Sequence, residues 1–348
     1  MQNLNQAAIL DESVASVLNR LDLNGLSGKR LFVTGGTGFF GLWLLTALKA
    51  LNPHNEVHVW VLSRDPGRFL SQYPQFRDQS WLHFVTGNVR DFEIPEQKFD
   101  LLLHAATETS KSAHNAPAEM LEDIVMGTRQ VLRMAERCGV RRILLISSGA
   151  VYGPQPLHVM HQPDDSQLAC STLLPSSAYG EGKRVMELMG ALLQQRTGIE
   201  SVVARCYAFS GPGLPLDGHY AMGNFVRDAL FGNEILVQGD GSALRSYLHG
   251  ADLAVWLLYL LTHGAAGQSY NVGSEESMSI KELALQVRDV LAPHKPVRIL
   301  KSEEVDMSER QRYVPDTSRA QALGCRQWTS LHDSLRITAN YWRAADEC

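Results

Sequence analysis

Three side chains in the middle of the chain have types and spacing suited to proton transfer. In "SAYGEGKRVMEL" (177–188), Tyr179 and Lys183 lie four residues apart, so on a helix they share one face, one turn apart. An ammonium group near a phenol stabilises the phenolate and is expected to lower the phenol pKa from its ordinary value of about 10. Such a tyrosine can accept a proton from a hydroxyl group or return one to a carbonyl. Ser148 ends the apolar run 144–148 and supplies a third polar group.

A glycine-rich turn precedes these residues. "TGGTGFFG" (34–41) lies between a short apolar run and a helical segment, with glycines in a G-x-x-G-x-x-G spacing. Glycines let the backbone approach a pyrophosphate closely, and the helix that follows presents free N–H groups to it. We therefore expect a dinucleotide at this turn, held by Gly35, Gly38, Phe39, Phe40 and Gly41.

The end of the second apolar run indicates which dinucleotide is bound. An acidic side chain there would bind the 2′-hydroxyl group of NAD, but the sequence "LSRDPGR" places Ser63 and Arg64 first and Asp65 after them. A hydroxyl group and a guanidinium suit a 2′-phosphate, so the pattern favours NADP. The alternative is NAD, with Arg64 solvated and Asp65 on the ribose.

The order of the predicted elements indicates the fold class. Strand-like runs alternate with helical segments, and their near-continuous apolar character is typical of parallel strands covered on both faces. We expect strands at 30–34, 56–65, 82–89, 99–107, 141–148 and 200–207, and helices at 12–22, 41–51, 118–139 and 177–196. This predicts an α/β protein with a doubly wound parallel sheet. Its parts are a helical extension (1–27), a mainly dinucleotide-binding domain (28–208) and a smaller, mainly substrate-binding domain (209–348) interleaved with it.

Composition excludes several classes of function. The 348 residues carry a net charge of −5 without a basic stripe, so we expect no nucleic-acid partner. Apolar runs such as 254–261 are far shorter than the roughly 20 residues that span a bilayer, and the first residues do not resemble a secretion signal. The five cysteines are scattered and form no CxxC pair, which indicates reduced thiols, a cytoplasmic protein and no metal site.

Five ordered motifs together carry a family resemblance. From about residue 28 to Trp342 the chain resembles the extended short-chain dehydrogenase/reductase family, in its nucleotide-sugar epimerase/dehydratase branch. The motifs are "TGGTGFFG", "ISSGAVYG", "YGEGK", "GDGSALRSYLHGADLA" (239–254) and "YNVGSEESMSIKELA" (270–284). The resemblance implies a Rossmann fold, an NAD(P) cofactor, and a homodimer formed through the Tyr179 helix and the 118–139 helix.

The resemblance also implies roles for single residues. Ser148 would hydrogen-bond the reacting oxygen, Tyr179 would be the acid/base, and Lys183 would also hold the nicotinamide ribose. Further cofactor contacts would come from Asn88 and Val89 beside the adenine, where an aspartate is commoner at the first position, and from Ala105, Ala106 and Thr107.

Substrate contacts follow from the same resemblance. Arg245 would bind the substrate diphosphate with its fork of donors. Arg310 or Arg312 would be a second phosphate partner, or else a solvated surface arginine. The family pattern R-x-x-N-x-x-G-P appears here as "RCYAFSGP" (205–212), so Ala208 replaces an asparagine that usually contacts the substrate. Asn224 would make that contact instead.

The two positions after Ser148 narrow the chemistry. The 4,6-dehydratases that the chain resembles carry Asp-Glu there, and the decarboxylases of the branch carry a glutamate, whereas this chain has Gly149 and Ala150. Elimination of water needs a further base and acid, which these residues cannot supply. Glu108 could supply the missing carboxylate for elimination, or it could be a polar loop residue without a catalytic role.

These observations predict an NAD(P)-dependent enzyme that moves a hydride and a proton at one carbon, C4, of a nucleotide-activated hexose. Epimerisation is the first interpretation and an NADPH-dependent 4-keto reductase is the second. A dehydratase and a non-catalytic NAD(P)-binding protein are the remaining alternatives.

Overall fold

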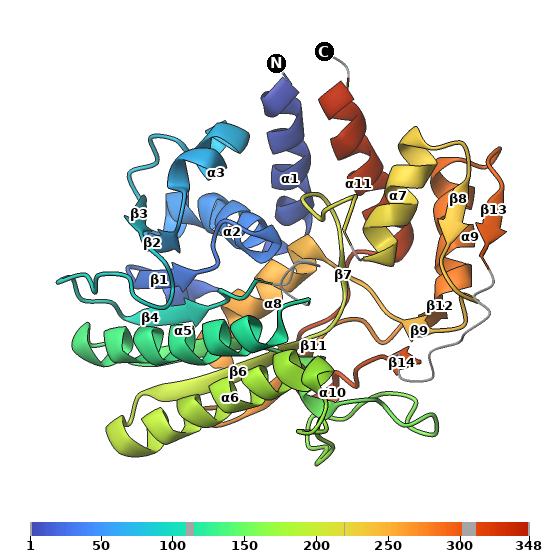
Figure 1. The fold of residues 1–348 in the computed structure, drawn as a ribbon. Helices are drawn as coiled ribbons and strands as arrows, with labels where there is room; N and C mark the ends of the chain where they lie inside the picture. Colours follow the sequence, from blue (N-terminus) through green and yellow to red (C-terminus); the bar gives the residue numbers. More distant parts are fainter. Residues whose placement is uncertain (1, 109–114, 219, 301–310, 347–348) are drawn as a thin grey trace.

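A parallel sheet of seven strands forms the centre of the molecule (Figure 1). The computed structural model describes residues 2–108, 115–218, 220–300 and 311–346. All neighbouring strands of the sheet are parallel, which confirms the doubly wound prediction. In spatial order they are β3 (Leu82–Thr86), β2 (His58–Ser63), β1 (Arg30–Thr34), β4 (Leu101–His104), β5 (Arg142–Ser148), β6 (Glu200–Cys206) and β11 (Ser269–Val272). The order reverses between β1 and β4, and in such sheets the crevice beyond the strand ends at that point binds ligands.

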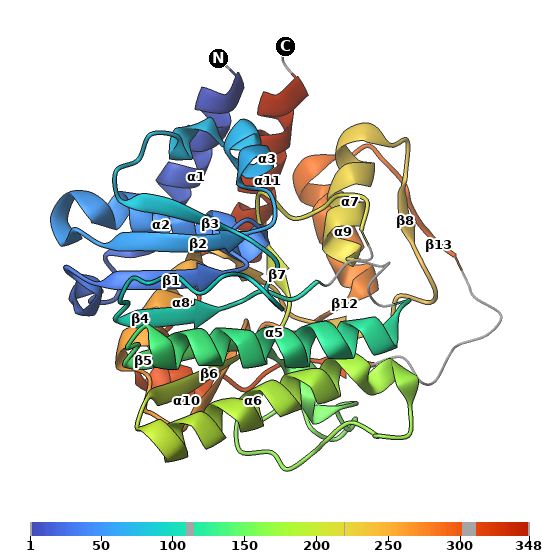
Figure 2. The same cartoon turned by 60° about the vertical axis from the view of Figure 1, so that its left-hand side comes forward.

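Helices cover both faces of the sheet (Figure 2). One face packs against α2 (Phe39–Asn55) and α8 (Gly250–His263), and the other against α5 (Pro117–Arg137) and α6 (Ala178–Thr197). Successive residues of β5 show the division, because side chains alternate along a strand. Leu144 and Ile146 belong to the core under α2 and α8, whereas Ile143 and Leu145 belong to the core under α5 and α6. The short helix α3 (Pro66–Gln72) follows β2.

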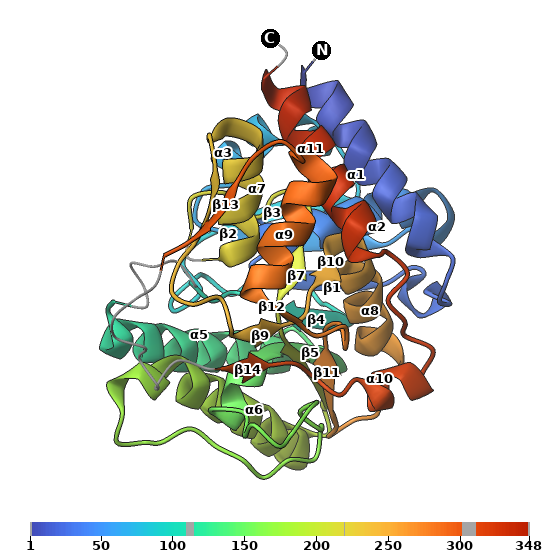
Figure 3. The same ribbon diagram turned by 90° about the vertical axis from the view of Figure 1, so that its right-hand side faces the viewer.

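The first helix is longer than the sequence predicted and is shifted towards the N-terminus. It was expected at 12–22, but α1 spans Gln2–Leu18, because the apolar period extends back through Leu10. Leu10, Val14 and Val17 are buried in the core that also contains α2 and α8. Helix α1 also lies along the last helix, α11 (Leu331–Asp346), so that the two ends of the chain are neighbours (Figure 3).

The second region builds a core of its own beside the sheet. Helices α7 (Ala221–Phe231) and α9 (Ile280–Leu291) pack against the parallel pair β8 (Ile235–Val237) and β13 (Val297–Ile299), and α11 packs against these two helices. Ser279 caps α9 in a capping box with Glu282. Strand β11 and helix α8 come after α7 in the chain, yet β11 belongs to the main sheet and α8 packs on it.

Several very short strands join the two regions. They are β7 (Phe209–Ser210) with β10 (Leu248–His249), and β12 (Met278–Ser279), β9 (Leu244–Arg245) and β14 (Arg312–Tyr313) in a three-stranded sheet. The helix α10 (Ser318–Ala322) follows β14. Among the residues that the structure describes, none of the helices is both long and apolar enough to cross a bilayer.

Candidate functional site

The glycine turn packs tightly against the sheet and stays open at its centre. Gly35 has a φ of +73°, and a Cβ added there would lie 2.7 Å from the carbonyl of Ala105. A Cβ on Gly41 would lie 2.1 Å from the carbonyl carbon of Gly36. A Cβ on Gly38 would meet only the oxygen of Gly35, at 3.7 Å. The turn therefore forms a cradle whose floor is backbone and whose open side is at Gly38.

The start of α2 supplies donors to this cradle. Gly38 is the N-cap, and Leu42 N–H makes the first backbone bond into the helix, to Gly38 O at 2.9 Å. The N–H groups of Phe39, Phe40 and Gly41 therefore lack partners within the helix, which is the arrangement that binds phosphate. The rings of Phe39 and Phe40 pack into the cores, with Phe40 edge-on to Phe209 at 5.0 Å, so these residues offer their backbone. The cradle fits a dinucleotide pyrophosphate.

The residues at the end of β2 and directly after it are paired with other groups of the protein. Ser63 is buried, and its hydroxyl accepts a hydrogen bond from Asp65 N–H at 3.2 Å. Asp65 in turn caps α3 by accepting from Arg68 N–H at 2.9 Å. Arg64 is exposed and forms an ion pair with Glu108 at 3.4 Å. Glu108 thus lies beside the end of β2, where the sequence places the adenosine part of the dinucleotide.

The two residues expected at the adenine differ in what they offer. Asn88 turns its side-chain oxygen to its own loop, where it accepts from Arg90 N–H at 3.0 Å. Val89 packs against Gly127 of α5, where an added Cβ would lie 2.9 Å from the valine. Asn88 is therefore occupied in a turn, and Val89 provides an apolar surface.

A buried histidine organises the segment after β4, and sequence reasoning missed it. His104 Nδ1 lies 2.7 Å from Thr34 Oγ1, which accepts from Ala106 N–H at 3.1 Å, and His104 Nε2 lies 3.3 Å from Thr128 Oγ1. Burial, with a smaller effect of the Lys183 charge, lowers the pKa of His104 to about 3, so the ring is neutral. This neutral network fixes Ala105, Ala106 and Thr107 beside the cradle.

Lys183 is buried at the centre of the site. Its ammonium donates to Thr107 Oγ1 and to Ile146 O, both at 2.7 Å, and lies 5.9 Å from the centre of the Tyr179 ring. Burial lowers the pKa of Lys183 to about 8, against smaller opposing effects of Cys206 and Glu187. The helix spacing thus brings Tyr179 and Lys183 together, and Lys183 also contacts the segment expected to line the cofactor.

The pKa of Tyr179 differs from the sequence expectation. Burial raises it above the ordinary value of a phenol, the neighbouring Tyr313 adds a smaller rise, and a hydrogen bond with Ser148 opposes both. The expected net lowering by Lys183 is not found, because the effect of burial is larger. Tyr179 is therefore a protonated phenol at neutral pH in this structure.

Ser148 lies at the end of β5 and joins several partners. Its Oγ accepts from Ala150 N–H at 3.1 Å and lies 3.1 Å from the hydroxyl oxygen of Tyr313, a residue that sequence reasoning missed. The structure thus assembles Ser148, Tyr179 and Lys183 from β5 and α6, as the motif spacing required.

An aromatic ring closes the space beside Ser148. A Cβ on Gly149 would lie only 2.5 Å from the ring of Tyr207, and that ring packs at a tilt against Tyr313, with 4.5 Å between ring centres. Ala150 is buried. Position 149 therefore has no room for a side chain, which is a physical reason for its glycine.

The expected substrate residues lie on two elements of the second region. In the three-stranded sheet Arg245 is the direct neighbour of Tyr313, so both side chains are on one face. Asn224 lies in the first turn of α7, and its buried Oδ1 has no hydrogen-bond partner among the described residues. Arg312 is not brought to Ser148: it is buried, and its guanidinium contacts Met160 Sδ at 3.2 Å. Arg310 lies outside the described residues.

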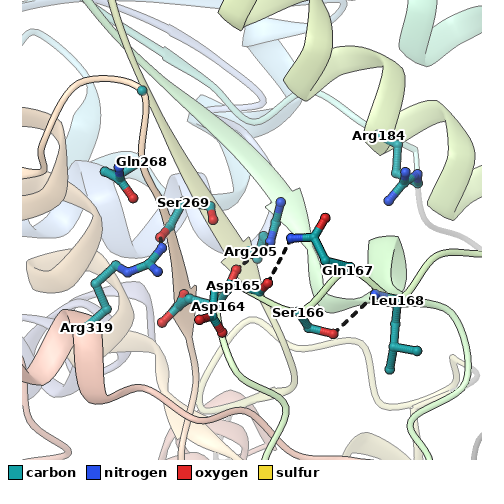
Figure 4. A pocket seen from close by; sticks show the side chains of 11 residues that line it. Asp164, Asp165, Ser166, Gln167, Leu168, Arg184, Arg205, Gln268, Ser269 and Arg319 are labelled. Atoms are coloured by element: carbon teal, nitrogen blue, oxygen red, sulfur yellow. Dashed lines mark hydrogen bonds between the residues drawn. The ribbon is translucent and has the colours of Figure 1, made fainter.

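A pocket of about 210 Å³ includes Thr107 and Glu108 and reaches α5. A polar pocket of about 330 Å³ lies by β6 and β11, where Figure 4 shows Arg205 between Asp164 and Gln167, with Arg184 and Arg319 on its two sides. None of the predicted site residues lines this polar pocket. Within the described residues, no group of three His, Cys, Asp or Glu side chains could hold a metal ion.

Comparison with known proteins agrees with this geometry. The pattern of the NAD dependent epimerase/dehydratase family matches residues 31–273. UDP-glucuronic acid decarboxylase 6 of Arabidopsis thaliana is 29% identical over 323 residues, which cover 91% of this chain and 90% of that protein.

Solved structures agree as well. The dTDP-glucose 4,6-dehydratase DesIV of Streptomyces venezuelae, solved with NAD, is 26% identical with a TM-score of 0.77, covering 90% of this chain and 97% of that one. The UDP-glucose 4-epimerase of Thermotoga maritima has the same fold, with a TM-score of 0.77 at 21% identity and coverage of 91% and 100%. Because the family pattern covers more than half of the chain, this protein belongs to the NAD dependent epimerase/dehydratase family.

Proposed function

We propose that the chain is an NAD(P)-dependent epimerase that acts at C4 of a nucleotide-activated hexose. The observation that carries the proposal is the assembly of Ser148, Tyr179 and Lys183 beside the glycine cradle, with no carboxylate at position 149 or 150. The bound dinucleotide supplies uptake and release of a hydride. The chain itself has to bind the sugar, orient it and move one proton.

The three residues divide that work. Ser148 donates a hydrogen bond to the sugar oxygen, and Tyr179, in its ionised form, takes the proton of that hydroxyl as the sugar carbon is oxidised to a carbonyl. Lys183 supplies positive charge under the Tyr179 ring. When the carbonyl becomes an alcohol again, Tyr179 gives the proton back to the oxygen and returns to its ionised form, so that protons and charge balance over the cycle.

The names of the relatives include decarboxylases and a dehydratase, but the site does not support those reactions here. The carboxylates that such enzymes carry after the hydroxyl residue are absent, and the Tyr207 ring fills the space at Gly149. Glu108, the substitute considered from the sequence, pairs with Arg64 at the end of β2. Hydride and proton transfer is the chemistry that remains.

A second candidate is a 4-keto reductase, and the state of Tyr179 favours it. Because burial raises its pKa, Tyr179 keeps its proton at neutral pH and is ready to donate it to a carbonyl oxygen. Turnover of a nucleotide hexose without added nicotinamide cofactor identifies the epimerase. Consumption of NADH or NADPH with a 4-keto nucleotide sugar identifies the reductase, and a protein that binds cofactor but does neither contradicts both.

The choice between NAD and NADP depends on Arg64. The family is NAD dependent, and binding of NADP through Ser63 and Arg64 is the finer proposal. Glu108 weighs against it, because its carboxylate neutralises Arg64 and would repel a 2′-phosphate.

We expect Glu108→Gln to shift the ratio of the two dissociation constants towards NADP by up to roughly 5-fold, since one charged contact at a surface contributes at most about 1 kcal/mol. The ratio can be measured by calorimetric titration with each cofactor. Glu96→Gln removes an equally exposed carboxylate that is not paired with Arg64 and should leave the ratio unchanged. An unchanged ratio in Glu108→Gln would show that Arg64 does not meet the 2′ position.

We also propose a homodimer formed through α5 and α6. The two helices pack together and leave Leu121 and Met126 of α5 and Leu188 and Leu192 of α6 exposed. The double change Leu188→Glu and Leu192→Glu should reduce the mass measured by light scattering from two chains to one. Leu157→Glu, at another exposed leucine, should leave that mass unchanged. A single-chain mass for the unaltered protein would contradict the proposal.

A further inference from the structure

We propose that Tyr313 is a positioning residue that directs the proton of Ser148 towards the reacting oxygen. The inference rests on the proposed hydride and proton transfer and adds a fourth group to it. It starts from the hydroxyl of Tyr313, whose oxygen lies 3.1 Å from Ser148 Oγ and which can also donate to Cys206 O at 3.3 Å. The two residues are separated by 165 positions in the sequence.

The Tyr313 ring is held on both sides. It packs at a tilt against Tyr207, with 4.5 Å between ring centres and an angle of 33° between the ring planes. Its backbone belongs to β14, which pairs with β9 and places Tyr313 opposite Arg245. A ring fixed by this packing and by strand pairing keeps its hydroxyl in place with little further loss of conformational entropy.

Counting hydrogen bonds shows what this hydroxyl does to Ser148. A serine hydroxyl has one proton to donate and two lone pairs that accept. Ala150 N–H fills one lone pair, at 3.1 Å. If Tyr313 donates to Ser148, the second lone pair is filled too, and the only remaining role of Ser148 is to donate its proton to Tyr179 or to the substrate oxygen. The Tyr313 hydroxyl has a second place for its proton, Cys206 O, when Ser148 instead donates to Tyr313.

This arrangement strengthens Ser148 as a donor. A hydroxyl that accepts two hydrogen bonds becomes more polarised and donates more strongly, by an estimated 10–30% per bond. The hydrogen bond from Ser148 lowers the pKa of Tyr179, so a stronger donor favours the ionised form of that tyrosine, whereas the negative charge of Tyr313 acts in the other direction and requires Tyr313 itself to be ionised. Tyr313 therefore acts on the proton transfer through Ser148, without contact with the departing hydrogen.

A double-mutant cycle tests this route. Tyr313→Phe keeps the ring and its packing and removes only the hydroxyl. We expect it to lower kcat about 10-fold with an unchanged KM, which corresponds to one hydrogen bond of about 1.4 kcal/mol. We also expect the acid limb of the pH profile of kcat to move to higher pH. In a Ser148→Ala background the same change should have no effect on kcat, because the serine hydroxyl through which Tyr313 acts is absent. An equal loss in both backgrounds, or no loss in either, would overturn the inference.

Tyr207→Phe is the matched control. It removes the other hydroxyl of the same ring pair, which is buried and has no hydrogen-bond partner among the described residues. It should leave the pH profile of kcat and the coupling energy of the cycle unchanged, whereas an effect equal to that of Tyr313→Phe would show that the loss is not specific to the hydroxyl on Ser148 and would overturn the inference.

A direct titration separates this inference from the proposed function. In the NAD complex, the phenolate absorbance that disappears in Tyr179→Phe reports the ionisation of Tyr179 without any substrate. Tyr313→Phe should raise the pH of this ionisation and Tyr207→Phe should not. If no sugar nucleotide is turned over but this shift is seen, the proposed function fails and the inference stands. If turnover is found without the shift and without coupling to Ser148, the reverse holds.

Discussion

Tyr179→Phe should lower kcat roughly 1,000-fold, within the range expected for loss of a general acid/base, while the dissociation constant of NAD stays within about twofold of the original. The hydroxyl of Tyr179 is the proton carrier in both proposed reactions. Its ring supports Lys183 at 5.9 Å and is kept by phenylalanine, so the cofactor contacts of Lys183 should be preserved. Steady-state kinetics and a titration with NAD measure the two quantities separately.

The control for this experiment is a tyrosine far from the site. Tyr259→Phe on α8 removes a hydroxyl from a ring that stacks on His263 and should leave kcat unchanged. If Tyr179→Phe keeps more than about a tenth of the activity, the proton must travel by another route. Tyr313 would then be the first residue to examine, because its hydroxyl also reaches Ser148.

Gly41→Ala should destabilise the fold and weaken cofactor binding. The new methyl group would lie 2.1 Å from the carbonyl carbon of Gly36, and neither backbone can yield without separating α2 from the glycine turn. Overpacking against side chains usually costs about 1–3 kcal/mol, and a clash between two backbones should reach or exceed the upper end. Thermal unfolding followed by circular dichroism should show a melting temperature lower by about 5 °C or more, as that free energy implies for a chain of this size.

Gly38→Ala separates the two effects. A methyl group at position 38 would meet only the oxygen of Gly35, at 3.7 Å, and the backbone there is extended, with φ −95° and ψ −168°. We expect an unchanged melting temperature and NAD binding weakened at least 10-fold, because the methyl group would enter the open side of the cradle. Undisturbed NAD binding in a folded Gly38→Ala protein would mean that the pyrophosphate lies elsewhere.

The parts of the site that the sequence predicted are those set by local spacing. Tyr179 and Lys183 share a helix, and Ser148 ends a strand whose apolar run is unmistakable, so their meeting follows from the parallel sheet. The alternation of strands and helices also predicted the main sheet, because each parallel connection requires a crossover. Helix α1 shows the limit of this reasoning. Where it starts depends on how far its apolar face remains in contact with neighbouring helices, and the sequence does not show those contacts.

The parts that the sequence did not predict depend on contacts between distant segments. Tyr313 reaches Ser148 from a strand of two residues, which has no periodicity to detect. The ring of Tyr207 over Gly149 and the pairing of Arg64 with Glu108 are likewise visible only in three dimensions. The sign of the pKa shift of Tyr179 was wrong for the same reason, since burial outweighs the neighbouring charge and burial is a property of the whole fold.

The pairing of α1 with α11 has a consequence for folding during synthesis. The ribosome makes α1 long before α11, since proteins are synthesised at about 5–20 residues per second. The apolar face of α1 that carries Leu10, Val14 and Val17 therefore lacks α11 as a neighbour until that helix has been synthesised. During that interval the nascent polypeptide exposes part of an apolar surface, which is covered when α11 docks.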